Sequence, residues 1–280
     1  MPKAYVFTRY GGPEVEAFVD VDRPSPGPGQ VLVAVRAAGV NPVDWKQRTG
    51  YRRPGETGER EFPAYFGNEV SGVVEEVGDD VEGFVVGDAV FGRPVVGGYS
   101  EYALLSVDLI AHKPAALSFT DAATLPVAGV TAYDGIRQLA RAAGLRVLGL
   151  SSAAKKDFVE SLGAVHVPSG PGWTERVPGD VDGVYDLVGG DVLEAAATLL
   201  ADRTKLVTAG AQSEVVEKLG GSRIALVRTS ERLEAVAELV VDGALDPHVS
   251  RTFPLERADE ALRTVEDGHA RGKTVIEVAG

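Results

Sequence analysis

Cysteine is absent from this sequence of 280 residues. Without thiols the chain cannot form disulfides, offer a thiolate nucleophile or hold zinc through cysteine. Histidine is scarce, and its four positions show neither i,i+4 spacing nor a paired carboxylate: His112, His166, His248 and His269. We therefore expect no metal site. The G-x-S-x-G motif of esterases is also missing.

Basic residues are outnumbered, with 28 Lys and Arg against 41 Asp and Glu, which gives a net charge of −13 and a pI of about 4.8. Such a surface repels phosphate backbones and anionic lipids, so we expect neither nucleic-acid nor membrane partners. The net charge does not exclude a local basic pocket for a phosphorylated cofactor. The start of the chain has no apolar signal core, and no uncharged apolar run of membrane-spanning length follows, so we expect a cytoplasmic protein.

The first 125 or so residues predict a β-rich region. Short runs of valine and other β-formers are separated by turn clusters at 24–29 and 78–80. The predicted strands are residues 4–7, 30–38, 69–77 and 89–91. This spacing is typical of an antiparallel barrel or sandwich.

From residue 119 onward, helical and strand patterns alternate, which predicts an α/β region with a parallel sheet and crossover helices. Ser118 is a candidate N-cap for the first helix. The predicted helices are 121–125, 131–143, 153–162, 193–200, 232–241 and 257–265. The predicted strands are 146–150, 183–188, 205–209, 249–253 and 274–278.

Six segments, in order and spacing, resemble the medium-chain dehydrogenase/reductase superfamily, in its zinc-independent quinone oxidoreductase-like (zeta-crystallin-like) branch. They are AAGVNPVD at 37–44, FGNEVSGVV at 66–74, VGDAVF at 86–91, GYSEYA at 98–103, LPVAGVTA at 125–132 and GHARGK at 268–273. The resemblance implies a GroES-like β-barrel domain, residues 1–126 and 249–280, and a truncated doubly wound, Rossmann-like domain, residues 127–248.

The glycine-rich turn of a nicotinamide-binding domain has no counterpart here. In the family, a strand, this turn and the start of a helix precede a segment like ARAAG at 140–144, whereas here the 131–139 helix runs directly into that segment. About two dozen residues are missing, and there is no G-x-G-x-x-G elsewhere. The segment from Gly268 to Thr274 resembles a phosphate-binding P-loop but is one residue short and precedes a strand. We expect strands 146–150 and 183–188 to close the gap by pairing directly.

Candidate catalytic residues are Asn41, Asp44 and Tyr51. Asn41 and Asp44 stand on a proline-containing turn after an apolar strand, where polar side chains can line a cleft. The resemblance implies that Asn41 lies near the nicotinamide ribose or the substrate carbonyl. A local Asx turn is the alternative. Tyr51 and Trp45 would line the cleft or pack as core, and packing is favoured for Trp45.

Candidate cofactor-binding residues follow the predicted strand ends. Ser151, Ser152 and Lys155 come after strand 146–150, where the family binds the adenosine ribose and its 2′-phosphate. A helix cap and a solvated lysine pair is the alternative. By resemblance, the nicotinamide side would be formed by Asn41, Thr131, Gly189, Ala209 and Gly210.

These features imply an NADP(H)-dependent oxidoreductase acting on quinones or activated C=C bonds, with a quinone, enone or polyketide-like substrate. The missing turn removes several backbone hydrogen bonds to a charged group, each worth about 1.5–3 kcal/mol, so NADPH is expected to bind weakly or not at all. A non-redox cyclase or dehydratase in the same cleft is one alternative. A non-catalytic binding protein or dimer partner is another, since the family often forms homodimers.

Overall fold

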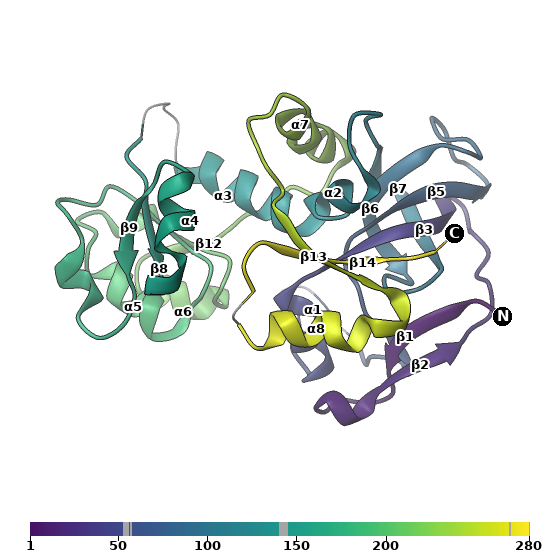
Figure 1. The fold of residues 1–280 in the computed structure, drawn as a ribbon, viewed down its shortest axis with the longest axis horizontal. Coiled ribbons are helices and arrows are strands. Elements are labelled where there is room, and N and C mark those ends of the chain that lie inside the picture. Colours follow the sequence, from purple (N-terminus) through teal and green to yellow (C-terminus); the bar gives the residue numbers. More distant parts are fainter. Residues whose placement is uncertain (53–55, 57, 140–144, 269, 280) are drawn as a thin grey trace. The chain divides into compact units, whose positions relative to one another are not determined.

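The computed structural model describes residues 1–52, 56, 58–139, 145–268 and 270–279 (Figure 1). The chain divides into two compact units: unit 1 is Met1–Val130 with Val227–Gly280, and unit 2 is Thr131–Leu226. The division differs from the predicted boundaries mainly in residues 227–248, which fold with unit 1.

Unit 1 is built on a sheet that closes on itself. Its strands are β1 (Lys3–Phe7), β2 (Glu16–Asp20), β3 (Gln30–Val40), β4 (Ala64–Tyr65), β5 (Val70–Val77), β6 (Ala89–Val96), β7 (Tyr102–His112), β13 (Val249–Pro254) and β14 (Lys273–Glu277). Six strands run in the order β13-β14-β3-β5-β6-β7, and β3 also pairs with β7, so β3, β5, β6 and β7 form a ring. A small sheet, β2-β1-β4, adds to it. The predicted barrel is thus present, with three strands, β2, β4 and β7, that were not predicted.

Helices cover the strands of unit 1. They are α1 (Pro42–Arg48), α2 (Phe119–Ala122), α7 (Ser230–Val241) and α8 (Ala258–Glu266), with short turns η1 (Pro13–Val15) and η6 (Leu255–Arg257) and a π-helix, η2 (Leu125–Gly129). Ser118 caps α2 by accepting a hydrogen bond from the Asp121 amide, as predicted. Leu255, Ala258, Ala261 and Leu262 of η6 and α8 pack into the same apolar core as β1, β3 and β5. Burial of this shared core is what holds the C-terminal segment to the barrel.

Helix α7 belongs to unit 1 because its buried face packs there. Thr229 caps it by accepting from the Arg232 amide, and the Ser230 hydroxyl donates to the Val107 carbonyl of β7 at 3.2 Å. Val236 approaches Gly129 at the end of η2. The alternation of elements that suggested a continuous α/β domain therefore ends before α7.

A buried arginine fixes α1 to the barrel wall. The Arg48 guanidinium is 1% exposed and forms ion pairs with Glu16 of β2 and, at 2.6 Å, with Glu266 of α8. The Tyr5 hydroxyl also donates to Glu16, at 2.6 Å. Charges buried in this way must be paired, so these contacts set the orientation of α1 and of the turn before it.

Unit 2 contains short helices and parallel strands. They are α3 (Val130–Leu139), β8 (Leu148–Ser151), η3 (Ala153–Lys155), α4 (Lys156–Ser161), β9 (Val165–Pro168), η4 (Trp173–Arg176), β10 (Val184–Asp186), α5 (Gly190–Ala197), η5 (Arg203–Lys205), β11 (Leu206–Thr208), α6 (Ser213–Lys218) and β12 (Ser222–Arg223). The predicted βα alternation is confirmed over this range. Its apolar core is small and centres on Leu193, Leu206 and Val216.

The parallel sheet of unit 2 is broken between β8 and β10. β8 pairs with β9, and β10, β11 and β12 form a second ladder; in the described part of the chain no ladder joins the two groups. The prediction that strands 146–150 and 183–188 pair directly is therefore wrong. The side chains flanking the break stay exposed, among them Val147, Leu187 and Val188. Closing a sheet requires both strands to reach pairing distance, and a two-stranded and a three-stranded ladder have little shared core to bring them together.

No described helix is long and apolar enough to cross a lipid bilayer.

Candidate active site

Asn41 and Asp44 form the N-terminal cap of α1, directly after β3. Asn41 is the N-cap, Pro42 occupies the first helical position, and the Asp44 carboxylate accepts a hydrogen bond from the Asn41 amide at 2.8 Å. This is one half of a capping box, in which the third helical residue satisfies the amide of the cap. The turn predicted from the sequence is thus present and rigidly built.

Asp44 is completely buried and accepts three hydrogen bonds. Besides the Asn41 amide, its donors are the Tyr99 hydroxyl at 2.9 Å and the Asn68 side-chain amide. Burial raises the pKa of the Asp44 carboxyl, and the hydrogen bonds from Asn41, Tyr99 and Asn68 oppose that rise. Burial also raises the pKa of the Tyr99 hydroxyl well above its ordinary value. With no surface exposed, Asp44 orients the turn, and this geometry does not favour a direct acid–base role.

Asn41 belongs to a second, charged network. The side-chain nitrogen Nδ2 of Asn41 donates to Oε1 of Glu69 at 2.7 Å, and the side-chain oxygen of Asn41 accepts from Nζ of Lys273 at 2.8 Å. Lys273 also contacts Glu69 Oε1 at 2.9 Å and the Val40 carbonyl at 3.2 Å, while Glu69 Oε2 accepts from the Val127 amide at 2.7 Å. One carboxylate therefore joins β5, α1, η2 and β14.

The aromatic candidates of α1 differ in environment. Trp45 is partly buried and packs against the main core of unit 1, which confirms the packing interpretation. Tyr51 is half-buried, and its amide donates to the Lys46 carbonyl at 2.9 Å. Tyr51 thus follows the C-terminal end of α1, whereas Asn41 caps the N-terminal end.

In unit 2, the strand ends of β10 and β11 lie against each other through two glycines. A Cβ added to Gly210 would come 2.7 Å from the Gly189 nitrogen, and one added to Gly189 would come 2.9 Å from the Gly210 carbonyl oxygen. Gly189 also has a φ of +80° and donates its amide to Asp186. The buried Asp186 carboxylate further accepts from the Thr208 hydroxyl. Close backbone approach of this kind requires glycine at both positions.

The candidates at the end of β8 form an accessible turn. Ser152 is exposed and caps η3, with its carbonyl accepting from the Lys155 amide at 2.9 Å. Ser151 is half-buried, and its carbonyl accepts from His166 and from the Ser169 amide. On α3, the Thr131 carbonyl accepts from the Tyr185 hydroxyl at 2.7 Å. Ala209 donates its amide to the Asp186 carbonyl at 2.8 Å. The predicted cofactor residues of unit 2 therefore follow the carboxyl ends of β8, β10 and β11, except Thr131, which lies at the start of α3.

The predicted site residues divide between the units: Asn41, Asp44 and Tyr51 belong to unit 1, and the remaining cofactor candidates to unit 2. Residues 140–144, where the glycine-rich turn was predicted to be missing, lie outside the described residues. Sequence reasoning missed Glu69, Asn68, Tyr99 and Lys273 as partners of the turn. All four stand inside segments that carried the family resemblance, and an acidic residue within an apolar strand was the one signal that could have identified Glu69.

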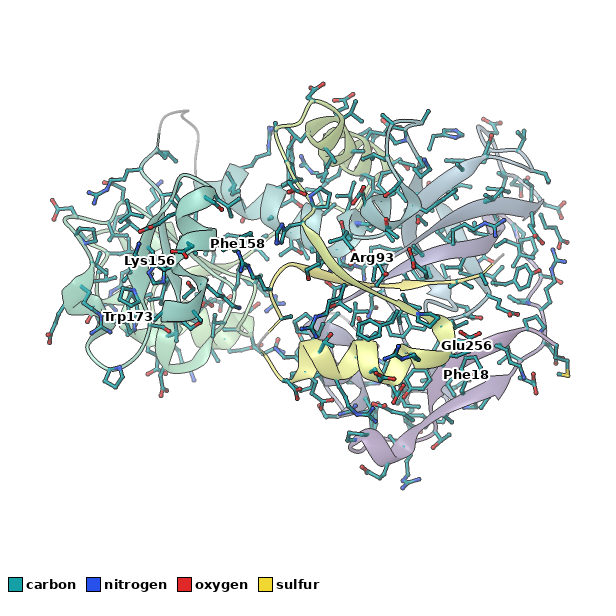
Figure 2. The ribbon with its side chains drawn as sticks, in the orientation of Figure 1. Phe18, Arg93, Lys156, Phe158, Trp173 and Glu256 are labelled. Carbon is teal, nitrogen blue, oxygen red and sulfur yellow. The ribbon has the colours of Figure 1, made fainter. Side chains whose placement is uncertain are left out.

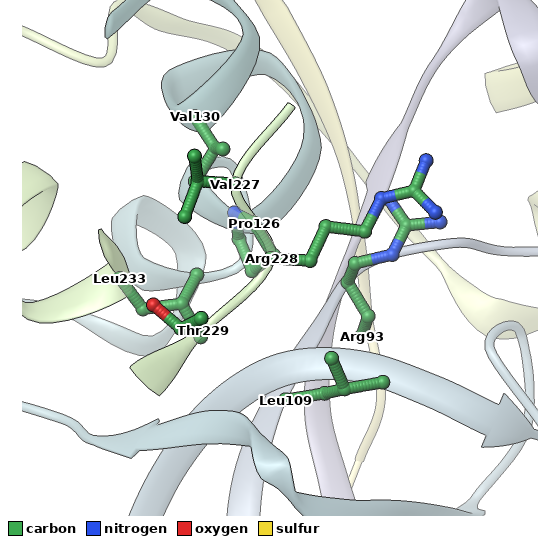
Figure 3. A pocket seen from close by; sticks show the side chains of 8 residues that line it. All are labelled: Arg93, Leu109, Pro126, Val130, Val227, Arg228, Thr229 and Leu233. Carbon is green, nitrogen blue, oxygen red and sulfur yellow. The ribbon is translucent and has the colours of Figure 1, made fainter. Parts of the chain in front are cut away.

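A small pocket in unit 1 is too small for a substrate. Arg93 and Arg228 extend to one side of it, and apolar side chains such as Pro126, Val130 and Leu233 line the other (Figure 3). Its volume is about 10 Å³, room for about one water molecule.

Comparison with known proteins covers both units. Residues 27–115 match the family model described as an alcohol dehydrogenase GroES-like domain, and residues 162–276 match one described as a zinc-binding dehydrogenase. A chloroplast envelope quinone oxidoreductase homolog of Arabidopsis thaliana is 28% identical over 323 aligned positions, covering 98% of each chain. A mitochondrial NAD(P)H oxidoreductase of Mus musculus is 28% identical, covering 98% of this chain and 89% of its own length.

Among solved structures, the quinone oxidoreductase of Coxiella burnetii superposes with a TM-score of 0.91 at 29% identity, over 99% of both chains. The alignment with the Arabidopsis relative spans 323 positions, although this chain has 280 residues, so at least 43 of those positions have no residue here. The fold is thus retained end to end in a shorter chain.

Proposed function

This chain belongs to the medium-chain dehydrogenase/reductase superfamily, in its quinone oxidoreductase-like branch, and we propose from that premise that it reduces a small quinone or an activated C=C bond with weakly held NADPH. The observation that carries the proposal is the set of strand ends in unit 2. Close backbone contact between Gly189 and Gly210 brings the chain after β10 against the chain after β11, and Ser152 and Lys155 follow the end of β8. In parallel sheets, dinucleotides bind at the carboxyl ends of the strands.

The fit of NADPH to these residues is partial. Ser151, Ser152 and Lys155 offer hydroxyls and an ammonium to the 2′-phosphate side, and Thr131, Ala209 and the two glycines offer the nicotinamide side. The sheet break between β8 and β10 supports the proposal that the strand carrying the pyrophosphate-binding turn has been deleted. Without that turn the helix N-terminus that would hold the pyrophosphate is lost, so binding is weak.

Zinc takes no part in the proposal. In the part of the chain that the structure describes, no group of three or more His, Cys, Asp or Glu is arranged to hold a metal ion. The oxygen atoms of Asn41 and Glu69 are bonded to the Lys273 ammonium, which already supplies a positive charge there. The residues present therefore do not fit zinc, and no metal takes part in the proposed reaction.

The 2′-phosphate gives the proposal a matched test. Lys155→Ala should weaken NADPH binding while leaving NADH binding unchanged, because only NADPH carries that phosphate. Lys156→Ala is the control: Lys156 is the next residue, lies on α4 (Figure 2) and is paired with Glu160 at 2.5 Å. Both affinities are measured by calorimetry, and NADPH consumption is followed with 1,4-benzoquinone.

A second candidate, a non-catalytic binding protein that has lost its cofactor, is favoured by the same sheet break. NADPH dissociation constants of millimolar or weaker, together with no benzoquinone-dependent NADPH consumption, would support it over the oxidoreductase. A cofactor-independent enzyme using Asp44 as an acid or base is not favoured, because the Asp44 side chain has no exposed surface.

A further inference from the structure

A polar groove in unit 1 lies between helix α8 and strands β13 and β14, and none of the candidate site residues lines it. Its volume is about 330 Å³, within the size range of small-ligand pockets. It borders the segment from Gly268 to Thr274, the P-loop-like sequence that the proposed function leaves unused.

One face of α8 supplies the helical side of the groove. Glu260, Arg263, Thr264 and Asp267 line it, at the i, i+3, i+4 and i+7 spacing of a single helical face. The apolar face of the same helix, with Ala261 and Leu262, is buried in the core. On the groove face, Thr264 is hydrogen-bonded to Thr274 of β14 at 3.2 Å, and the other lining side chains of the helix are charged.

Two more arginines reach the groove from the other side. Arg251 is on β13, opposite Thr274 of β14 in the strand register, and Arg271 precedes β14. Arg251 is exposed. Three guanidinium groups around one groove contrast with a net charge of −13 for the whole chain. Guanidinium groups bind phosphate through paired, charge-assisted hydrogen bonds.

The two acidic residues of the groove, Glu260 and Asp267, restrict the kind of ligand that it can bind. The carboxylates of Glu260 and Asp267 would repel a bare anion, but they accept hydrogen bonds from hydroxyl groups, as acidic residues do for a ribose diol. Glu260 is also held by Arg257, at 2.5 and 2.7 Å, so its position is fixed. A ligand with an anionic end and a hydroxylated body satisfies both charges.

We propose that this groove binds a phosphorylated sugar, with the phosphate on Arg251 and Arg271 and sugar hydroxyls on Asp267. The site shares no residue with the NADPH proposal.

Calorimetry of the full chain with ribose 5-phosphate, ribose and inorganic phosphate tests the assignment. Ribose 5-phosphate should bind at least about tenfold more tightly than either fragment, since each charged hydrogen bond adds about 1.5–3 kcal/mol. Arg251→Ala should weaken binding of ribose 5-phosphate about tenfold or more. Arg9→Ala, which removes an exposed arginine of unit 1 outside the groove, should leave it unchanged.

Asp267→Asn separates the sugar from the phosphate: it should weaken binding of ribose 5-phosphate and should not weaken binding of inorganic phosphate, because it removes a carboxylate that repels a bare anion. Lys155→Ala should change neither the affinity for ribose 5-phosphate nor that for inorganic phosphate, which distinguishes this site from the proposed cofactor site. Equal affinity for phosphate and ribose 5-phosphate would overturn the sugar assignment. Absence of binding, or equal losses in Arg251→Ala and Arg9→Ala, would overturn the site.

Discussion

The Nζ atom of Lys273 lies 2.9 Å from Oε1 of Glu69, so the final strand of the chain is tied to the start of β5 by an ion pair in which Glu69 has no exposed surface. The same ammonium holds the side chain of Asn41. The Asn41 side chain, predicted to be catalytic, is thus held in part by a residue more than two hundred positions away.

Lys273→Met should destabilise unit 1 by about 3–5 kcal/mol, because it leaves the Glu69 carboxylate buried without a counter-charge. The two tryptophans lie in different units, so Trp173→Phe leaves Trp45 as a fluorescence reporter of unit 1 during urea unfolding. Adding Glu69→Gln to Lys273→Met should restore part of the lost stability. A loss below about 1 kcal/mol in the single variant would mean that the pair behaves as an exposed one.

Asp44 should give unit 1 a pH dependence of defined sign. Its folded pKa is raised, chiefly by burial, so between the ordinary aspartate pKa and the raised value the folded state binds more protons than the unfolded state. Its contribution to stability is therefore largest at low pH and falls as the pH rises through that window.

The Asp44 contribution is isolated by comparison with Asp44→Asn, which cannot titrate. Exposed carboxyls with lowered pKa values, such as Asp20 beside Lys3, act in the opposite direction but are common to both proteins and cancel. The stability of the wild type minus that of the variant should fall with rising pH. A difference that is flat or rises between pH 4 and 7 would contradict the raised pKa.

Gly135→Ala should destabilise unit 2, although alanine favours helices over glycine by about 1 kcal/mol. A Cβ at this position would come 2.2 Å from Cζ of Tyr185, whose ring packs on α3 and whose hydroxyl bonds to Thr131. Overpacking of this kind costs about 1–3 kcal/mol. In a Tyr185→Ala background the sign should reverse, and Gly135→Ala should stabilise. The free energy of unfolding is measured in both backgrounds by urea unfolding of a Trp45→Phe chain, with Trp173 as the fluorescence reporter. If Gly135→Ala destabilises the protein in both backgrounds, the Tyr185 ring is excluded as the cause.

The strands of the barrel could be predicted because their valine-rich runs and turn clusters are local signals. β7 was missed although it spans Tyr102–His112, because serine, aspartate and histidine interrupt its apolar pattern. α7 was predicted as a helix, but the predicted domain boundary grouped it with residues 127–248, whereas the structure groups it with unit 1. An amphipathic pattern shows which face of a helix is buried but does not identify the element against which that face packs.

For the candidate site, too, local sequence patterns identified the turn but not its distant partners. The cap formed by Asn41 and Asp44 could be read from the turn itself, because capping depends on residues three apart. Its charged partners could not be, since Glu69 and Lys273 come from distant strands whose register is set by tertiary packing. The pairing of strands 146–150 and 183–188 was predicted wrongly because removal of a central strand does not by itself supply the apolar contacts that would draw its neighbours together.

Hydrogen exchange should expose the consequence of the broken sheet. In β8 no residue is buried and in β9 only Val167 is, whereas most of β3 is buried. Opening of a two-stranded ladder with so little core costs far less than opening the barrel, so amides in residues 148–151 and 165–168 should exchange at least about a hundredfold faster than those in 31–40. Mass spectrometry of peptic fragments gives both rates in one sample. Equal protection would mean that the facing edges of β8 and β10 are paired in solution, and the proposed deletion of a central strand would then have to be given up. Added NADPH should slow exchange at residues 151–155 if the cofactor binds there, because a bound ligand stabilises the closed state of this turn.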